Sequence, residues 1–423
     1  MEDNMDIKEL CNLIDENKEE LFSLLGSFIR INSENYRTGG REKELAELIH
    51  KMALELGLES DIYSPLDLEG FKNHPDYMDG RHLEDRYNVT VAYKGEADEN
   101  ALMLMAHTDT VEIGDRASWC FDPLSGEVVD GKVLGRGACD DKYGIAVSLF
   151  IMKLLKKSGF APKKNLLFSA YCDEEHGGSH GALAAVIKDP CEIYVNLDGF
   201  QNELWNCASG GQEAKYLYHT EDTVDSAERT AEAIPVILEV MREFKKKRTA
   251  ELEANPYYKG SDIPKTCMRY MDIRAGKSGT DLDRGEVFFT YYTVKSREEI
   301  NAEFAELERK LAERLSPLGI VGDGFVPCTR FFHYTHIPAD HAAIRTLLDA
   351  GKEAVGYAPV VCGSCLSDLS VIGKYGGGAA FMYGCARGFD SPGGAHQANE
   401  YISCDALVDF TKTVAAYVLK IIG

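Results

Sequence analysis

The chain has 423 residues, of which 44% are hydrophobic and 27% are charged, a composition typical of folded globular proteins. This length predicts two or three domains, because a single core rarely grows beyond about 250–300 residues. With 69 acidic and 46 basic residues, the formal net charge is −23. Nucleic acids and anionic membrane surfaces require a basic binding face, so neither is an expected partner.

The N-terminal sequence MEDNMDIKEL is acidic and lacks the basic-then-apolar order of a secretory signal. No stretch reaches the roughly 18 apolar residues of a membrane span. Twelve cysteines without a secretory signal indicate reduced thiols. Cys362 and Cys365 have the C-x-x-C spacing of a redox or zinc pair, but no second such pair accompanies them. We therefore expect a cytoplasmic protein with ordinary thiols.

The first 200 residues alternate between helical and strand-like patterns. Apolar residues recur at helical spacing in residues 10–28 and 45–52. Short apolar runs bounded by turn residues predict strands, and two helical stretches lie between them: strands at Asn88–Ala92, Ala101–Ala106, Leu166–Cys172 and Ile193–Leu197, helices at Ile145–Leu155 and Gly181–Ile187. Buried strands alternating with helices predict an α/β fold, in which helices sandwich a mainly parallel sheet.

The pattern changes near Cys207, where a charged helical stretch over residues 223–250 begins. Pro235 should kink that helix or mark its start. Three strand-like stretches follow, and Ser296 with Glu299 forms a capping box that opens another helix: the strands are Cys267–Ile273, Val287–Thr293 and a stretch near Arg330–His336. This block predicts a smaller α+β domain at residues 207–336.

The α/β pattern returns after Pro338. It predicts a helix at Ala342–Val355, a strand at Ala379–Tyr383 and a closing helix from Ser403. We therefore expect one discontinuous domain, residues 1–206 and 337–423, with residues 207–336 inserted into it.

Five residues with metal-binding side chains stand where apolar runs give way to loops: His107, Asp140, Glu175, Asp198 and His396. The carboxyl ends of strands in an open α/β sheet are where ligands bind. Any one of these residues alone would usually be a solvated loop residue. Together, two imidazoles and three carboxylates suit two zinc-like ions that share one carboxylate.

The motifs AHTDTV, LGRGACDDKYG, YCDEEHGGS, NLDGF and GGAHQANEY occur in this order along the chain. They resemble the zinc-dependent family of aminoacylases, acetylornithine deacetylases, succinyl-diaminopimelate desuccinylases and related carboxypeptidases and dipeptidases. The likeness is strong in both outer segments and weak between residues 207 and 336. It implies a fold with a catalytic domain and an inserted lid or dimerisation domain, through which a homodimer would form.

The resemblance also implies roles for individual residues. Asp140 would bridge two metal ions, one held also by His107 and Asp198, the other by Glu175 and His396. Asp109 would orient the His107 imidazole through its free ring nitrogen, and Glu174 would be the general acid/base. A cis peptide bond is implied between Asp140 and Asp141. Near the C-terminus, Gly363, Ser364 and Asp368 resemble a loop that contacts substrate in relatives.

The predicted function is metal-dependent hydrolysis of an amide bond in an N-acyl amino acid. Zinc is the expected metal, with cobalt or manganese as alternatives. A deacylase is favoured because residues 64–134 most resemble the deacetylase and desuccinylase branch. A dipeptidase or carboxypeptidase using the same metals is the alternative. A third hypothesis is a non-catalytic relative that binds a small metabolite, although the intact ligand set and Glu174 favour an enzyme.

Overall fold

The computed structural model describes residues 5–222, 224–277 and 281–423. The chain divides into two compact units. The larger comprises residues up to Asn206, His336–Cys362 and Val371–Gly423, and the smaller comprises Cys207–Thr335 and Gly363–Ser370. The last of these segments was predicted within the larger domain. It joins the smaller unit because the Ser364 carbonyl accepts hydrogen bonds from the Ser209 amide and the Tyr258 hydroxyl.

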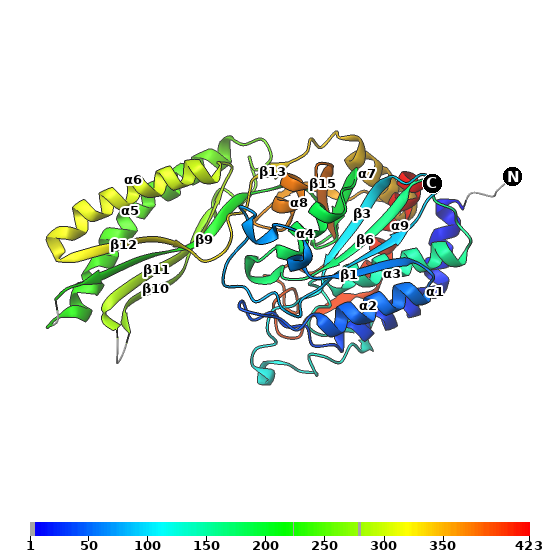
Figure 1. Ribbon diagram of the computed structural model, residues 1–423, viewed down its shortest axis with the longest axis horizontal. Coiled ribbons are helices and arrows are strands. Elements are labelled where there is room, and N and C mark those ends of the chain that lie inside the picture. The colour runs from blue at the N-terminus through cyan, green and yellow to red at the C-terminus, as the bar shows by residue number, and fades with distance from the viewer. Residues whose placement is uncertain (1–4, 223, 278–280) are drawn as a thin grey trace. The chain divides into compact units, whose positions relative to one another are not determined.

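A nine-stranded sheet organises the larger unit (Figure 1). Its centre is parallel, as predicted, and both flanks add antiparallel strands, so the sheet is mixed. The strands follow one another across the sheet as β1 (Glu59–Tyr63), β2 (Asn88–Tyr93), β6 (Asn165–Tyr171), β3 (Asn100–His107), β7 (Ile193–Asn196), β15 (Ala379–Gly384), β8 (Glu203–Ala208) and β13 (Thr335–His336), and β14 (Val360–Ser364) pairs with β8.

Helices cover this sheet because its central strands are apolar on both sides. All seven residues of β6 are buried, as are seven of the eight in β3, and such strands need cover on both faces. The helices of this part of the chain are α1 (Ile7–Ile29), α2 (Lys43–Glu55), α3 (Lys142–Lys157), α4 (His180–Lys188), α7 (Ala342–Val355), α8 (Leu369–Tyr375) and α9 (Cys404–Ile422). Helices α3 and α9 pack against β3 and β6, and α4 packs against β2 and β6. The predicted α/β class is confirmed.

A short three-stranded sheet connects two loops of the larger unit. Strand β16 (Tyr401–Ser403) pairs with β5 (Lys132–Leu134), which pairs with β4 (Val128–Val129). β5 lies just before the Gly-rich segment that contains Asp140, and β16 lies just after His396. Pairing of β5 with β16 therefore brings together two segments that are more than 250 residues apart in the chain.

The smaller unit is an antiparallel sheet covered by two long helices (Figure 1). The strand order is β10 (Met268–Lys277), β11 (Asp281–Thr293), β9 (Gly210–Thr220) and β12 (Ile320–Pro327), and the helices are α5 (Ser226–Ala254) and α6 (Arg297–Leu315). The predicted capping box is present at the start of α6. Pro235 lies inside α5 and does not mark its start. Strands β9 and β12 were not predicted, and the strand expected near Arg330–His336 is limited to β13.

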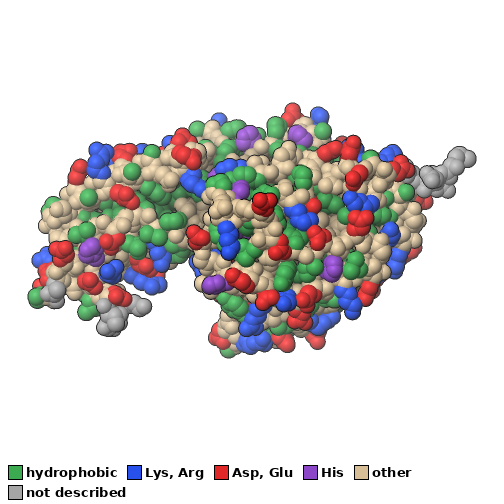
Figure 2. Space-filling view, in the orientation of Figure 1, with side chains coloured by type: hydrophobic (Ala, Val, Ile, Leu, Met, Phe, Trp, Pro, Cys, Tyr) green, Lys and Arg blue, Asp and Glu red, His purple; other side chains and the backbone are tan. Residues whose placement is uncertain are grey.

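Acidic and basic side chains are interspersed over the face shown in Figure 2. Among the helices of the described residues, none has both the length and the apolarity needed to cross a bilayer. No disulfide joins the cysteines of the described residues, and Cys362 and Cys365 are not bonded to each other.

Candidate metal centre

Four of the five predicted ligands follow directly from the parallel core of the larger unit. His107 is the last residue of β3, Glu175 follows β6, Asp198 follows β7, and Asp140 lies two residues before α3. Neighbouring parallel strands end at the same edge of a sheet, so their following residues meet there. The fifth, His396, comes from the loop between β15 and β16.

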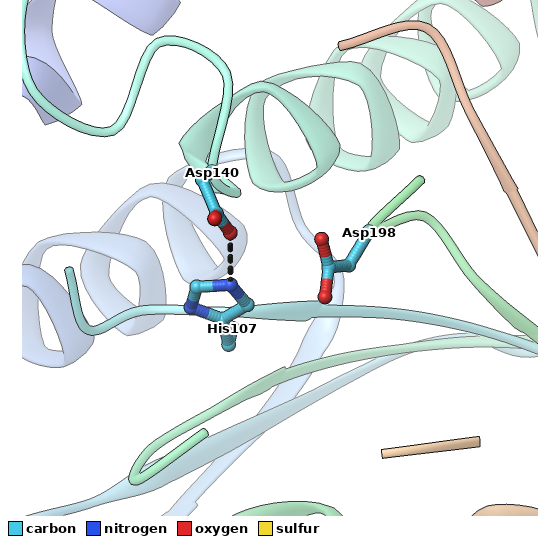
Figure 3. A group of neighbouring side chains, drawn as sticks. All are labelled: His107, Asp140 and Asp198. Atoms are coloured by element: carbon cyan, nitrogen blue, oxygen red, sulfur yellow. Dashed lines mark hydrogen bonds and ion pairs between the residues drawn. The ribbon is translucent and has the colours of Figure 1, made fainter. Parts of the chain in front are cut away.

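The structure brings these residues into two groups that share Asp140. His107, Asp140 and Asp198 form one group, and Asp140, Glu175 and His396 form the other; within each group the ligand atoms lie within 4.8 Å of one another. The Asp198 carboxylate faces the hydrogen-bonded pair of His107 and Asp140 (Figure 3). Asp140 uses a different oxygen toward each group: Oδ1 is 2.8 Å from His107 Nε2, and Oδ2 is 3.1 Å from His396 Nε2.

The donor set fits a pair of divalent metal ions. Imidazole nitrogens and carboxylate oxygens are common zinc ligands, and a carboxylate with one oxygen toward each group is suited to bridging. Next to the shared ligand, the Asp141 carboxylate is fully buried and both of its oxygens lack a hydrogen-bond partner among the described residues. Cations would compensate the negative charge of this buried cluster and favour the charged form of Asp141, whose pKa burial raises well above its usual value. The peptide bond between Asp140 and Asp141 is cis, as the resemblance implied.

Protons compensate this negative charge in the metal-free chain. Burial opposes a charged ring at His107, but the hydrogen bond to Asp140 and its charge raise the pKa of His107 well above its usual value. Burial also disfavours the charged ring of His396, yet the charge of Glu175 and the hydrogen bond to Asp140 raise its pKa to about 11. Burial would raise the pKa of Asp140, but its hydrogen bonds to both histidines hold it well below its usual value. Metal binding must therefore displace protons.

Asp109 contacts the free ring nitrogen of His107 through its main chain. The His107 ring nitrogen Nδ1 lies 2.9 Å from the Asp109 main-chain carbonyl and 3.7 Å from the nearer carboxylate oxygen. The carboxylate instead accepts the amide N–H of Glu174 at 3.1 Å and that of Glu175 at 2.9 Å. The backbone of Asp109 thus orients the imidazole, while its side chain holds the loop with the predicted base.

A buried ion pair joins the loop of Asp140 to the loop of His396. Glu400 Oε1 accepts the amide N–H groups of Gly137 at 3.0 Å and Cys139 at 2.7 Å. Its second oxygen pairs with Arg136, which also donates to the Gln397 carbonyl at 3.3 Å. Sequence reasoning did not identify either residue of this pair. The signal available was the motif itself, since Arg136 and Glu400 both lie within the segments that carried the resemblance.

The three residues predicted to contact substrate, Gly363, Ser364 and Asp368, lie in the smaller unit. Asp368 is buried, and one of its oxygens lies 3.5 Å from Arg330 Nη2. Ser364 is also buried, and Gly363 packs closely on the ring of Tyr258. Their part in binding substrate stays a prediction.

Known proteins with related sequence or fold include a metallohydrolase, a desuccinylase and a dipeptidase. The sequence model of peptidase family M20/M25/M40 matches residues 103–420. An uncharacterized metallohydrolase of Methanocaldococcus jannaschii is 31% identical over 185 residues, which cover 43% of this chain and 42% of that protein. A succinyl-diaminopimelate desuccinylase of Wigglesworthia glossinidia brevipalpis is 39% identical over 95 residues, 22% of this chain and 25% of that protein. These matches therefore span less than half of either curated relative.

Among solved structures, the dipeptidase Dug1p from Saccharomyces cerevisiae superposes with a TM-score of 0.74 at 15% identity, covering 98% of each chain. At that identity the likeness shows a shared fold. The family match extends over most of the sequence and includes all five predicted ligands. The chain therefore belongs to peptidase family M20/M25/M40.

Proposed function

We propose that this chain is a two-metal amidohydrolase that releases an amino acid from an N-acylated precursor. The observation that carries the proposal is the pair of ligand groups sharing Asp140, with Glu174 directly beside the ligand Glu175. His107 and Asp198 would hold one ion, Glu175 and His396 the other, and Asp140 both. When bound, two divalent ions supply a water that is acidic near neutral pH and polarise the scissile carbonyl.

Glu174 supplies the proton transfer in this proposal. Its side chain is partly exposed, unlike the buried Glu175. Glu174 has a helical backbone and precedes the short 3-10 helix Glu175–Gly177. Consecutive side chains of a helical turn point in different directions, so one can face a metal ion while the other faces the substrate. Glu174 takes a proton from the attacking water and returns it to the departing amine nitrogen.

The substitution Glu174→Gln tests this role. The variant should keep about two metal ions per chain and lose at least roughly a hundredfold in kcat. Glu112→Gln is the matched control, because Glu112 is a half-exposed glutamate of the same unit that pairs with His176 and not with a predicted ligand. Metal analysis and turnover should be measured on the same preparations. Near-normal turnover of the Glu174 variant would exclude it as the base.

A deacylase is the preferred substrate class, supported by the local likeness to the desuccinylase and by the resemblance of residues 64–134. The dipeptidase alternative is supported by a fold shared with Dug1p. A panel of N-acetyl, N-succinyl and N-formyl amino acids alongside dipeptides, each with a chelator control, separates the two. Cleavage of dipeptides alone would overturn the deacylase assignment. No cleavage of any member by zinc-, cobalt- or manganese-loaded protein would favour a non-catalytic, metabolite-binding role.

A further inference from the structure

Two buried carboxylates, those of Asp109 and Asp173, hold the loop that contains Glu174. Asp109 accepts the amides of Glu174 and Glu175, one with each carboxylate oxygen. Asp173, the residue before Glu174, has a left-handed backbone with φ of 61° and is fully buried. The position of Glu174 therefore depends on what holds Asp109 and Asp173.

Asn35 contacts both carboxylates at once. Its side-chain amide nitrogen lies 2.7 Å from Asp109 Oδ2, 3.3 Å from Asp173 Oδ1 and 3.2 Å from the Glu175 carbonyl. Asn35 is fully buried, and its main-chain N–H donates to the Thr110 carbonyl at 2.8 Å. An amide donor is neutral, so it can join two carboxylates without a further buried charge.

Two arginines neutralise the same carboxylates. Arg86 Nη1 donates to Asp173 at 2.7 Å, and its Nη2 lies 3.9 Å from Asp109. Arg81 Nη1 lies 3.3 Å from Asp173. On the other side of Asp173, His180 Nδ1 is 2.6 Å from Oδ2. Because His180 Nε2 accepts the Met78 amide N–H, Nδ1 carries the proton and donates to Asp173.

We propose that Asn35 is a positioning residue for catalysis, which holds Asp109 against the Glu174 and Glu175 amides and thereby aims the Glu174 carboxylate. This inference rests on the proposed function, because it takes Glu174 as the base. Asn35, Arg81 and Arg86 all precede residue 103, where the family match begins. In this proposal, the segment before residue 103 thus helps to position Glu174.

Two substitutions of Asn35 separate positioning from packing. Asn35→Ala removes the donor and should lower kcat about 10- to 100-fold, because small misplacements of a catalytic group have effects of this size. Asn35→Asp keeps the shape but points a carboxylate at Asp109 and Asp173, and should lower kcat at least as much. KM and the two metal ions per chain should change little in both. A purely steric role would leave the Asp variant near wild type and would overturn the proposal.

Asn165→Ala is the matched control. Asn165 is also a fully buried asparagine with several side-chain hydrogen bonds, but it begins β6, whereas Glu174 follows the end of that strand. Hydrogen–deuterium exchange gives a readout independent of activity. Amides of residues 171–180 should exchange about tenfold faster in Asn35→Ala and remain unchanged in Asn165→Ala, since only the former loses hydrogen bonds to this loop. Equal exchange in both variants would overturn the proposal.

A double-mutant cycle connects Asn35 to Glu174. If Asn35 acts through Glu174, Asn35→Ala should reduce kcat less than threefold in a Glu174→Gln background. A full 10- to 100-fold loss in that background would show that Asn35 acts elsewhere, as would activity restored by added zinc. Near-normal turnover of Glu174→Gln alone would instead refute the proposed base, while the exchange experiment would still decide whether Asn35 orders the loop. The cleaved member of the acyl–amino acid and dipeptide panel serves as substrate.

Discussion

Replacing Glu400 by Gln tests whether the buried ion pair with Arg136 stabilises the metal centre. Glu400 is fully buried and Arg136 is 3% exposed, so solvent does not screen the pair appreciably. One Glu400 oxygen serves two backbone amides and the other serves the guanidinium. A glutamine has one carbonyl oxygen and one amide group, so it can satisfy one side and must present N–H to the other.

The expected loss follows from this mismatch. Removing one partner of a buried ion pair costs about 3–5 kcal/mol, because the remaining charge is left uncompensated. Burial raises the pKa of Glu400 to about 7, so the measurement is made at about pH 8 or above, where Glu400 is charged. For a unit of several hundred residues, a loss of this size corresponds to a decrease in Tm of at least roughly 5 °C. The weakening should also reach the metal centre, since Arg136 donates to the carbonyl next to His396 and Glu400 holds the amide next to Asp140.

Scanning calorimetry with and without zinc measures both effects. Glu353→Gln provides the control, because Glu353 forms an ion pair with Lys420 and its side chain is 53% exposed. Such surface pairs contribute at most about 1 kcal/mol. Glu400→Gln should lower the Tm of the metal-free protein and also reduce the increase in Tm that zinc produces. A decrease in Tm no larger than that of the control would refute the reasoning.

Three further results are expected. Zinc binding at pH 7 should release about two protons per chain, because carboxylate neighbours keep both histidines of the cluster protonated; calorimetry in buffers of different ionisation enthalpy measures this, and no release would contradict it. Burial outweighs the arginine partner of Glu42 and raises its pKa to about 7, so the folded chain binds more protons than the unfolded chain between about pH 4.3 and 7. Stability should therefore fall as pH rises through that window, and Glu42→Gln should flatten this part of the Tm profile; an unchanged slope would count against the assignment. Chelation should leave exchange of residues 171–180 nearly unchanged, whereas strong deprotection would show that metal ions order this loop.

The core strands could be predicted because their burial is visible in the sequence. The run Ala101–Ala106 predicted β3, observed over Asn100–His107, to within a residue at each end. The strands of the smaller unit are half-exposed, and their signal is weaker. In β9, the short apolar run Tyr216–Tyr218 is flanked directly by Lys215 and His219, so no long apolar run appears. The first half of β11, DLDRGE, is charged and is held by cross-strand hydrogen bonds to β9 and β10.

The candidate site divides in the same way. The five predicted ligands have side chains with recognisable metal chemistry, and each follows an apolar run or belongs to a glycine-rich motif. Asn35 and Arg86 have no such signal, because an asparagine or arginine between helices usually lies on the surface. Their function depends on partners 74 and 87 residues away in the chain. Such contacts form only when the sheet is assembled, so periodicity and spacing could not predict them.

The arrangement of charge explains how so many acids can be packed at one sheet edge. Asp173 pairs with Arg86 and Arg81, and Asp109 lies 3.9 Å from Arg86. Asp140 and Glu175 have histidine partners instead, whose protons metal ions can replace. Arginines, which stay charged, compensate the first set of carboxylates. The protons on the histidines compensate the second set and can be exchanged for metal ions. Because the amides of Glu174 and Glu175 are bound by Asp109, on the permanently compensated side, the loop with the base can keep its shape while metal ions enter and leave.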